Sequence, residues 1–442
     1  MSKHRTQSRT PISPALGTSS KQQNPTRKNS AVSNSTSERK SLPFLVYVLA
    51  MGTFLMGTSE FVVAGLLPDI ASNLAIGISE AGLLVTAFAI GMIATPLIAV
   101  AALEMPERTT LLLALAVYSA GHIVVALTDD LSVILVARFV TALATGAFWS
   151  LAASVASRVA GPNASARAIG LVLSGGILAT VIGVPLGSVA GQLVGWRGPF
   201  WILAVFAVLA SVPIARFVPS GRSVSTVIPL RSQLAAVATG RLWVVMAACV
   251  LISTAVMSTY SFIAPLLTER SGLAVGLLPL GLTIFGVGAV TGTLNSGRFA
   301  DRAPYVTALN GGVIVVIALG LLSVFSSFAT PSIALLAVAG MAGLGTNPVL
   351  MSMAVRFAEG APTLATSLCT SMFNLGTAVG TWVTAQAISE YGPAAIPVVG
   401  ALFAVLLVVP LAALVIIDRA RRDSDAASAP SQSVAGHEVE VR

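Results

Sequence analysis

Apolar residues occur along this chain in long runs that are separated by short polar stretches. A run of about 20 apolar residues has the length an α-helix needs to cross the hydrocarbon core of a bilayer. Since the backbone must satisfy its own hydrogen bonds in lipid, runs of this length predict helices and exclude strands. We count twelve runs, at residues 43–67, 79–102, 108–128, 131–156, 167–192, 199–217, 241–267, 275–296, 306–328, 331–353, 363–388 and 394–417. The sequence therefore predicts an all-α membrane protein with twelve transmembrane helices.

The polar stretches outside these runs suggest the domain organisation. Residues 1–42 are rich in Ser, Thr, Gln and Asn and contain eight of the Lys and Arg residues, so we expect a disordered cytoplasmic tail. A partner-binding arm is the alternative for this tail. The longest internal polar stretch, 218–240, predicts a cytoplasmic linker between six-helix bundles at 43–217 and 241–417, and 418–442 is a second predicted tail.

Composition supports this view, and the charges orient the chain. Hydrophobic residues make up 55% of the sequence and charged residues only 10%, whereas soluble proteins have about 25% charged residues. If the N-terminus is inside, 22 of the 25 Lys and Arg residues lie on the cytoplasmic side, two outside and one within the membrane. Cytoplasmic loops carry an excess of Lys and Arg, so both termini are predicted to be cytoplasmic.

The sequence lacks the residues that several classes of protein need for their function. The net charge of +8 lies in tails and loops, without the basic face and interleaved aromatic residues that would indicate nucleic-acid binding. We find no zinc ligands, no Ser/His/Asp set and no phosphate loop, so an enzyme is not expected. Cys249 and Cys369 are interpreted as small core residues, and His122 as a packed residue, with a position lining a cavity as its alternative.

One carboxylate, Glu60, lies inside the first apolar run, in the stretch LMGTSEFVVAGLLPDIASN. An ionisable residue within a membrane helix is costly and indicates a functional site when a partner can be named. Glu60 lies about 25 Å from the inner boundary at 1.5 Å per residue, and Arg138 in the fourth run about 20 Å. The matched depth predicts that these two residues interact. A purely structural ion pair, or an interfacial position of Glu60, are the alternatives.

Three stretches carry a resemblance to a known family. The loop GRFADR, with Gly297, Asp301 and Arg302, resembles the cytoplasmic-loop signature of the major facilitator superfamily. The equivalent loop after the second run, ALEMPERT, lacks the aspartate of that signature, so Glu104 and Glu107 are candidates for replacing it. The fourth run, ARFVTALATGAFWS, resembles the arginine motif of proton-coupled members.

The fifth run reads GVPLGSVAG and resembles a variant of the antiporter motif, with Gly183, Pro185 and Gly187 expected to kink and thin the helix where the two halves meet. Together with TSEFVVAGLLPDIA and GWRGPFW, these motifs resemble the twelve-span drug:proton antiporter group, and within it chloramphenicol exporters and sugar or purine-nucleoside efflux permeases. The resemblance implies two pseudo-symmetric six-helix bundles with a substrate site between them. Weak similarity of SEFVVAGLLPDIASN to YSFIAPLLTERSG places Ser261 opposite Glu60.

The resemblance also implies a function and a mechanism. We expect a proton-coupled exporter of small amphiphilic compounds, with Glu60 carrying the proton and Arg138 tuning it. Burial favours the neutral form of Glu60 and a nearby guanidinium favours the charged form. Export of a sugar or nucleoside, and passive facilitation, are the alternatives. Helical spacing predicts these cavity-lining residues: Thr53, Met56, Gly57, Thr141, Thr145, Met257, Tyr260 and Asn374.

The expected partners follow from the same resemblance. They are a small-molecule substrate and the lipid bilayer, with no nucleic acid, and the protein is expected to be monomeric. The proton gradient takes the place of a cofactor, and no metal site is expected. The predicted location is the bacterial inner membrane.

Overall fold

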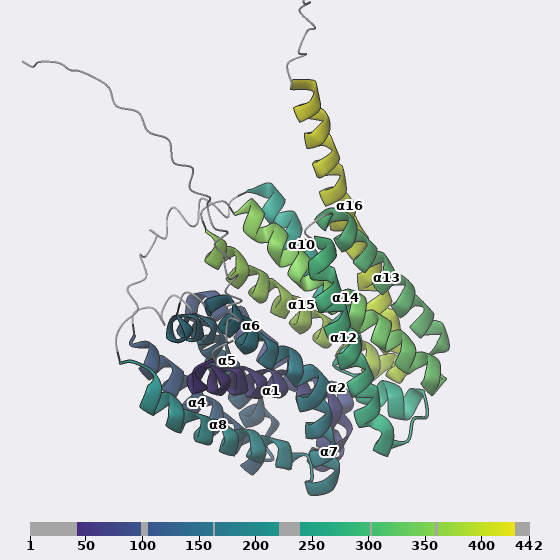
Figure 1. Cartoon of the computed structure of the whole chain (residues 1–442). Helices are drawn as coiled ribbons and strands as arrows, with labels where there is room; N and C mark the ends of the chain where they lie inside the picture. The colour runs from purple at the N-terminus through teal and green to yellow at the C-terminus, as the bar shows by residue number, and fades with distance from the viewer. Residues whose placement is uncertain are drawn as a thin grey trace, which may run out of the picture. The chain divides into compact units, whose positions relative to one another are not determined.

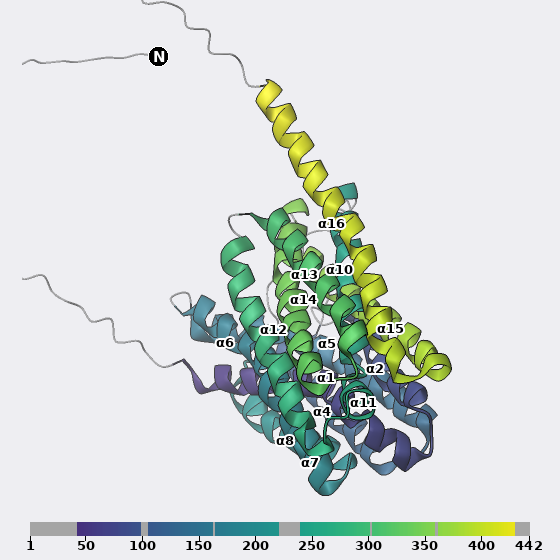
Figure 2. The same cartoon turned by 90° about the vertical axis from the view of Figure 1, so that its right-hand side faces the viewer.

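The computed structural model describes residues 42–98, 105–161, 164–220, 239–300, 303–358 and 361–428. The described residues are almost entirely helical (Figures 1 and 2). The helices of the N-terminal half are α1 (Phe44–Leu74), α2 (Ile78–Ile93), α4 (Glu107–Leu127), α5 (Leu131–Ala160), α6 (Ser165–Leu178), the π-helix η1 (Ala179–Gly183), α7 (Val184–Val194) and α8 (Arg197–Phe217). Those of the C-terminal half are α10 (Gly240–Tyr260), α11 (Ile263–Pro265), η2 (Leu266–Arg270), η3 (Val275–Leu277), α12 (Leu278–Ala300), α13 (Pro304–Phe325), α14 (Ala329–Phe357), α15 (Pro362–Tyr391), η4 (Gly392–Ala394) and α16 (Ala395–Ser428).

The predicted fold of twelve membrane helices is confirmed. Within the described ranges, ten helical stretches are long and apolar enough to cross a membrane, and α2 is a shorter apolar helix. The longest stretch, Leu364–Ala420, contains two spans, α15 and α16, because the chain turns at Gly392 with a φ of 68°. Figure 1 shows α1, α4, α5 and α8 gathered on one side and α10, α13, α14 and α16 on the other.

The outward-facing side chains are those of a protein in lipid. Leu97, Leu193, Val324 and Val409 each expose about 70% or more of their surface. Exposed apolar residues of this size spread over every span would make a water-soluble protein aggregate. In a bilayer the same residues contact hydrocarbon at no such cost.

Local chemistry explains where several spans begin and end. Asp130 caps α5 because its carboxylate accepts hydrogen bonds from Ser132 N and Val133 N, at 2.8 and 3.3 Å. Ala75 ends α1 in the left-handed conformation, with a φ of 54°. The seventh span is broken at Ser261 and Phe262, so α10 ends at Tyr260 inside the protein and leaves a turn there.

Several helices differ from the predicted boundaries; α1, for example, continues to Leu74, beyond the predicted end at residue 67. The twelfth span continues as α16 to Ser428, beyond the predicted end at residue 417, and its last turns extend past the other helices in both views (Figures 1 and 2). The second span is helical from Ile78 and turns at Ala94. Most of the predicted N-terminal tail and linker, residues 1–41 and 221–238, lies outside the described residues.

The two halves pack along two lines of contact. Helix α2 packs against α15, where Thr86 and Thr381 share a hydrogen bond of 2.7 Å and Ser371 donates to the carbonyl of Ile93 at 2.9 Å. Helix α12 packs against η1 and α7. Gly286 makes this approach possible, because a methyl group there would lie 2.5 Å from the carbonyl oxygen of Thr180.

Candidate functional site

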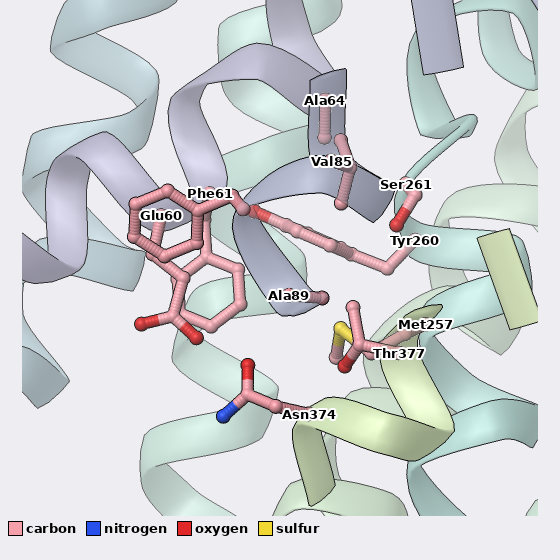
Figure 3. A pocket seen from close by; sticks show the side chains of 11 residues that line it. Glu60, Phe61, Ala64, Val85, Ala89, Met257, Tyr260, Ser261, Asn374 and Thr377 are labelled. Atoms are coloured by element: carbon pink, nitrogen blue, oxygen red, sulfur yellow. The ribbon is translucent and has the colours of Figure 1, made fainter. Parts of the chain in front are cut away.

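A pocket lies between the two halves at the level of the break after α10. Its wall is formed by α1, α2, α15, the end of α10 and the following turn (Figure 3). The lining residues are Glu60, Phe61, Ala64, Val85, Phe88, Ala89, Met257, Tyr260, Ser261, Asn374 and Thr377. The enclosed space that a water-sized molecule could occupy is only about 10 Å³, far below the ~300–1,000 Å³ of small-molecule sites. The space is narrow, so a drug-sized compound requires the walls to move apart.

The polar groups of the pocket face one another beside a wall of aromatic rings. Figure 3 shows the carboxylate of Glu60 and the amide of Asn374 directed into the same space. The Asn374 amide nitrogen donates to the carbonyl of Thr370 at 3.0 Å, so its oxygen is left to accept. Phe61 and Tyr260 meet edge to face with ring centroids 5.9 Å apart. The site thus offers two acceptors beside aromatic surface, which suits a compound with an apolar ring and a donor group.

Arg138 lies directly behind this wall, inside the N-terminal half, with 1% of its surface exposed. Its Nη1 donates to the Ser59 hydroxyl at 3.0 Å and its Nη2 to the Ser59 carbonyl at 3.1 Å. Its Nε lies 3.5 Å from the carbonyl oxygen of Leu84, and its guanidinium carbon lies 4.4 Å from the centroid of the Phe88 ring. Neutral acceptors and an aromatic face therefore surround this buried charge.

Ser59 connects Arg138 to two further buried side chains on α4. The Ser59 hydroxyl lies 2.8 Å from Nε2 of His122, and Nδ1 of His122 lies 2.7 Å from the carbonyl oxygen of Tyr118. The Tyr118 hydroxyl donates to the carbonyl of Leu55 at 2.7 Å. We call Ser59, Tyr118, His122 and Arg138 the buried network. It joins α1, α4 and α5 at the level of the pocket.

The predicted partners Glu60 and Arg138 are near one another without forming an ion pair in this structure. The ion pairs of the described residues join Arg158 to Glu107 and Arg197 to Asp129. Consecutive residues of a helix point about 100° apart. Ser59 therefore faces Arg138 inside the bundle while Glu60 faces the pocket. The two proposed roles, proton carrier and tuning residue, stay predictions.

The predicted cavity residues separate into two groups. Met257, Tyr260 and Asn374 line the pocket. The other five lie inside the N-terminal half, outside the wall of this pocket, and their role in a substrate cavity stays a prediction. Thr53 donates to the carbonyl of Val172 at 2.6 Å, and Thr141 and Thr145 bond backbone carbonyls one turn back. Met56 accepts from Thr145, and Gly57 packs on α6 and η1.

In the motif of the fifth span the helix passes through a π-helical segment before Pro185, and its glycines pack against α1 of the same half. The π-helix η1 lies just before Pro185. A proline lacks an N–H and displaces the carbonyl four residues earlier, which explains the irregular turn there. A methyl group on Gly183 would lie 2.1 Å from Oγ1 of Thr58, and one on Gly187 would lie 2.3 Å from Cγ2 of Val62. Both glycines therefore thin the helix toward α1 in the same half. The contact with the other half depends on Gly286 of α12.

The loop signature can be described only in part. Gly297 lies in the last two turns of α12, and Asp301 and Arg302 lie outside the described residues. Glu107, which was a candidate for replacing the missing aspartate, is buried and pairs with Arg158 of the same half. In this structure Glu107 therefore holds α4 to α5 and makes no ion pair with the other half.

Sequence reasoning missed four residues of the site. Phe61 and Thr377 line the pocket, and helical spacing next to Glu60 and Asn374 was the signal that could have identified them. Ser59 and His122 complete the buried network. Packing was expected for His122, but a histidine in contact with a buried serine and arginine is a polar partner, and nothing in the local sequence gives that contact.

Comparison with known proteins identifies the family. The model of the major facilitator superfamily matches residues 49–363. The chain belongs to the major facilitator superfamily. It is 35% identical over 353 residues to the "Chloramphenicol resistance protein" of Streptomyces lividans, covering 79% of this chain and 90% of that protein. It is 30% identical over 368 residues to the "Probable sugar efflux transporter" of Mannheimia succiniciproducens, covering 83% of this chain and 92% of that protein.

Solved structures of the superfamily share the fold of this transporter. The nucleoside transporter NupG superimposes with a TM-score of 0.70 over 84% of this chain and 98% of that chain, at 12% sequence identity. The chain is thus a multi-pass membrane protein of the superfamily, and the pocket lies where its two halves meet.

Proposed function

We propose that this superfamily member is a proton-coupled efflux transporter of small amphiphilic compounds, with chloramphenicol-type drugs as its leading substrates. The observation that carries the proposal is the position of Glu60, a membrane carboxylate in a pocket between the two halves, one residue from the serine that holds Arg138. Similarity to the chloramphenicol resistance protein over most of both chains supports the substrate class.

The pocket supports a neutral, ring-containing substrate. Phe61, Phe88 and Tyr260 supply aromatic surface, while Asn374 and Thr377 supply an amide and a hydroxyl. The described lining residues include a single ionisable carboxylate and no lysine or arginine. A substrate with several charges would leave charges unpaired in this apolar setting, which is costly. A compound with one or two donor groups fits the acceptors of Glu60 and Asn374.

Coupling follows from competition at Glu60. When the pocket opens outward, a proton enters and Glu60 becomes neutral, so its attraction to Arg138 and to a donor group of the substrate weakens and the substrate leaves. When the pocket opens inward, substrate binding and the nearby guanidinium favour the charged carboxylate, and the proton leaves to the cytoplasm. Each cycle therefore exchanges substrate for proton.

The orientation completes the proposal. The strong bias of Lys and Arg places both termini in the cytoplasm of a bacterial cell, with the protein in the inner membrane. The transporter acts as a monomer, and the proton gradient supplies its energy. The six helices of each half rock about the pocket, which moves its walls apart on one side of the membrane at a time.

Transport by Glu60→Gln tests the coupling. Inverted membrane vesicles energised with a pH gradient should accumulate radiolabelled chloramphenicol with the wild type, and accumulation by Glu60→Gln should fall to that of vesicles without the protein. Counterflow exchange, which needs no gradient, should remain. Asp69→Asn is the matched control, because Asp69 is a carboxylate of the same helix outside the pocket. Gradient-driven accumulation by Glu60→Gln at the wild-type rate would contradict the proposal.

Sugar efflux is the second candidate, favoured by the similarity to a sugar efflux transporter. A susceptibility panel of drugs, and an export panel of sugars and purine nucleosides, distinguish the substrates when both use an efflux-deficient host. A passive facilitator predicts that an uncoupler leaves export unchanged, whereas the proposed exporter predicts that export stops.

A further inference from the structure

The buried network contains a histidine for which proton coupling by Glu60 and Arg138 alone gives no role. His122 has 1% of its surface exposed and lies on α4, one helix behind the pocket. Its ring stacks on Tyr118, with centroids 4.0 Å apart, and lies 5.8 Å from the ring of Phe200 on α8. The imidazole is thus held from both sides, and its two nitrogens are both within hydrogen-bond distance of named atoms.

The hydrogen bonds determine which nitrogen carries the hydrogen. Arg138 only donates, so the Ser59 oxygen accepts from it and directs its own hydrogen elsewhere. The atom in reach is Nε2 of His122, which therefore accepts. A backbone carbonyl only accepts, so Nδ1 must donate to Tyr118 O. His122 is consequently the neutral tautomer with its hydrogen on Nδ1.

This tautomer has a consequence for Arg138. With the Ser59 hydrogen directed to His122, the lone pairs of that hydroxyl face the guanidinium. Nη1 and Nη2 both bond to Ser59, and Nε faces the carbonyl of Leu84. The guanidinium therefore has partners that are independent of the charge on Glu60. The guanidinium of Arg138 can therefore remain buried when Glu60 is protonated and neutral. Without these hydrogen bonds, its positive charge would then have no compensating partner.

We infer that His122 is a positioning residue for Arg138: by accepting the Ser59 hydroxyl it holds the guanidinium on Ser59 and away from the Glu60 carboxylate. The inference rests on the proposed proton coupling and adds the group that sets how strongly Arg138 acts on Glu60. The ionisable groups that face His122 are Tyr118 on its own helix and Arg138 on α5, whereas Glu60 on α1 faces the pocket. Phe200 is its neighbour on α8.

Three variants and one control separate this role from simple packing. His122→Leu removes the acceptor, and Ser59→Ala removes the group that it orients. His122→Gln keeps an acceptor for Ser59 but cannot carry a proton. Ser119→Ala is the matched control, because Ser119 lies on α4, is equally buried, and donates to the carbonyl of Ala204 at 3.1 Å, outside the network. Size-exclusion chromatography identifies variants that fold.

The first measurement needs no substrate. Infrared difference spectra of the purified protein, recorded as a pH titration, report the protonated carboxyl of Glu60 as the band that Glu60→Gln lacks. We expect His122→Leu and Ser59→Ala to shift the titration midpoint of that band by about one pH unit or more, the size expected when a charge-assisted hydrogen bond is redistributed. His122→Gln and Ser119→Ala should titrate as the wild type does.

The second measurement uses transport of radiolabelled chloramphenicol. His122→Leu should lose gradient-driven accumulation about tenfold while counterflow stays, and His122→Gln should restore it. If the wild type does not transport chloramphenicol, the proposed substrate fails while the infrared titration still decides the role of His122. A wild-type titration in His122→Leu overturns the inference. Equal shifts in His122→Gln and His122→Leu also overturn it, since the imidazole would then act through its own proton.

Discussion

The two halves of this transporter share one plan but place different chemistry at equivalent positions. A methyl group on Gly175 would approach Ala50 O and Thr53, and one on Gly376 would approach Val250 O and Ser253 in the same manner. In both comparisons, a residue of α10 corresponds to the residue of α1 that is 200 positions earlier, Val250 to Ala50 and Ser253 to Thr53. Glu60 is therefore equivalent to Tyr260. The prediction that Glu60 is equivalent to Ser261 is therefore wrong by one residue. Tyr260 and Ser261 both line the pocket.

A second matched contact relates the helices behind the pocket. Gly121 packs on the hydroxyl of Thr141, and Gly311 packs on that of Thr346, with nearly identical distances. The residue after each glycine is His122 in one half and Gly312 in the other. Three residues before each threonine stand Arg138 and Gly343, respectively.

Apolar side chains occupy the space that the buried network fills in the first half. A methyl group on Gly312 would meet Leu411, and one on Gly343 would meet Val256. Among the described residues, the buried ionisable side chains of the N-terminal half include Glu107, His122 and Arg138, whereas the buried polar side chains of the C-terminal half are Ser, Thr and Asn. The comparison teaches that the buried ionisable groups on which the proposed proton coupling depends lie in one half, and that the other half supplies neutral polar and aromatic contacts.

Among the variants that test this asymmetry, Arg138→Met should have the largest effect on gradient-driven transport. It removes two hydrogen bonds from a charged donor, each contributing about 1.5–3 kcal/mol, so we expect gradient-driven transport to fall by about 100-fold or more. The variant also leaves the buried Ser59 oxygens without their donor. The thermal midpoint in detergent should therefore fall as well, and transport is compared at equal amounts of folded protein. Thr346→Val in α14 is the control; a similar loss of transport there would contradict the asymmetry.

Gly175→Val and Gly376→Val test the 200-residue relation. Each introduces a side chain against backbone that is already in contact, and overpacking of this kind costs about 1–3 kcal/mol. The two variants should lower the thermal midpoint by similar amounts. Gly320→Val is the control, since nothing lies within 4 Å of a methyl group at that position. A large difference between the first two variants would show that the halves are not equivalent there.

The smallest effects are expected at Ser59 and its equivalent, Thr259. The Thr259 hydroxyl is buried without a hydrogen-bond partner among the described residues, whereas Ser59 has two side-chain partners. Thr259→Val should be neutral or stabilise by about 1 kcal/mol, and Ser59→Ala should destabilise by about 1–3 kcal/mol. Chemical or thermal unfolding of the two variants in the same detergent measures the difference. Equal destabilisation would indicate a partner of Thr259 that this conformation lacks.

The sequence by itself determined the spans, the family and the depth of the membrane carboxylate, Glu60. Runs of apolar residues fix the number and length of membrane helices, because lipid allows few other structures. Counting residues from the ends of a span gives the depth of Glu60 and Arg138. Helical spacing also gave Met257 and Tyr260 as cavity candidates, and an amide at mid-depth gave Asn374; all three line the pocket.

Only the tertiary structure decided what each side chain faces. Helix α1 is apolar on nearly every face, so its pattern does not define which face is buried. The rotation of α1 about its axis sends Ser59 to Arg138 and Glu60 to the pocket, and it places Thr53 and Met56 inside the bundle. Contacts between distant segments are likewise absent from local sequence. Cys249 and Cys369 are buried on α10 and α15, two helices that pack against each other, and His122 contacts Ser59, because helix packing brings distant segments together.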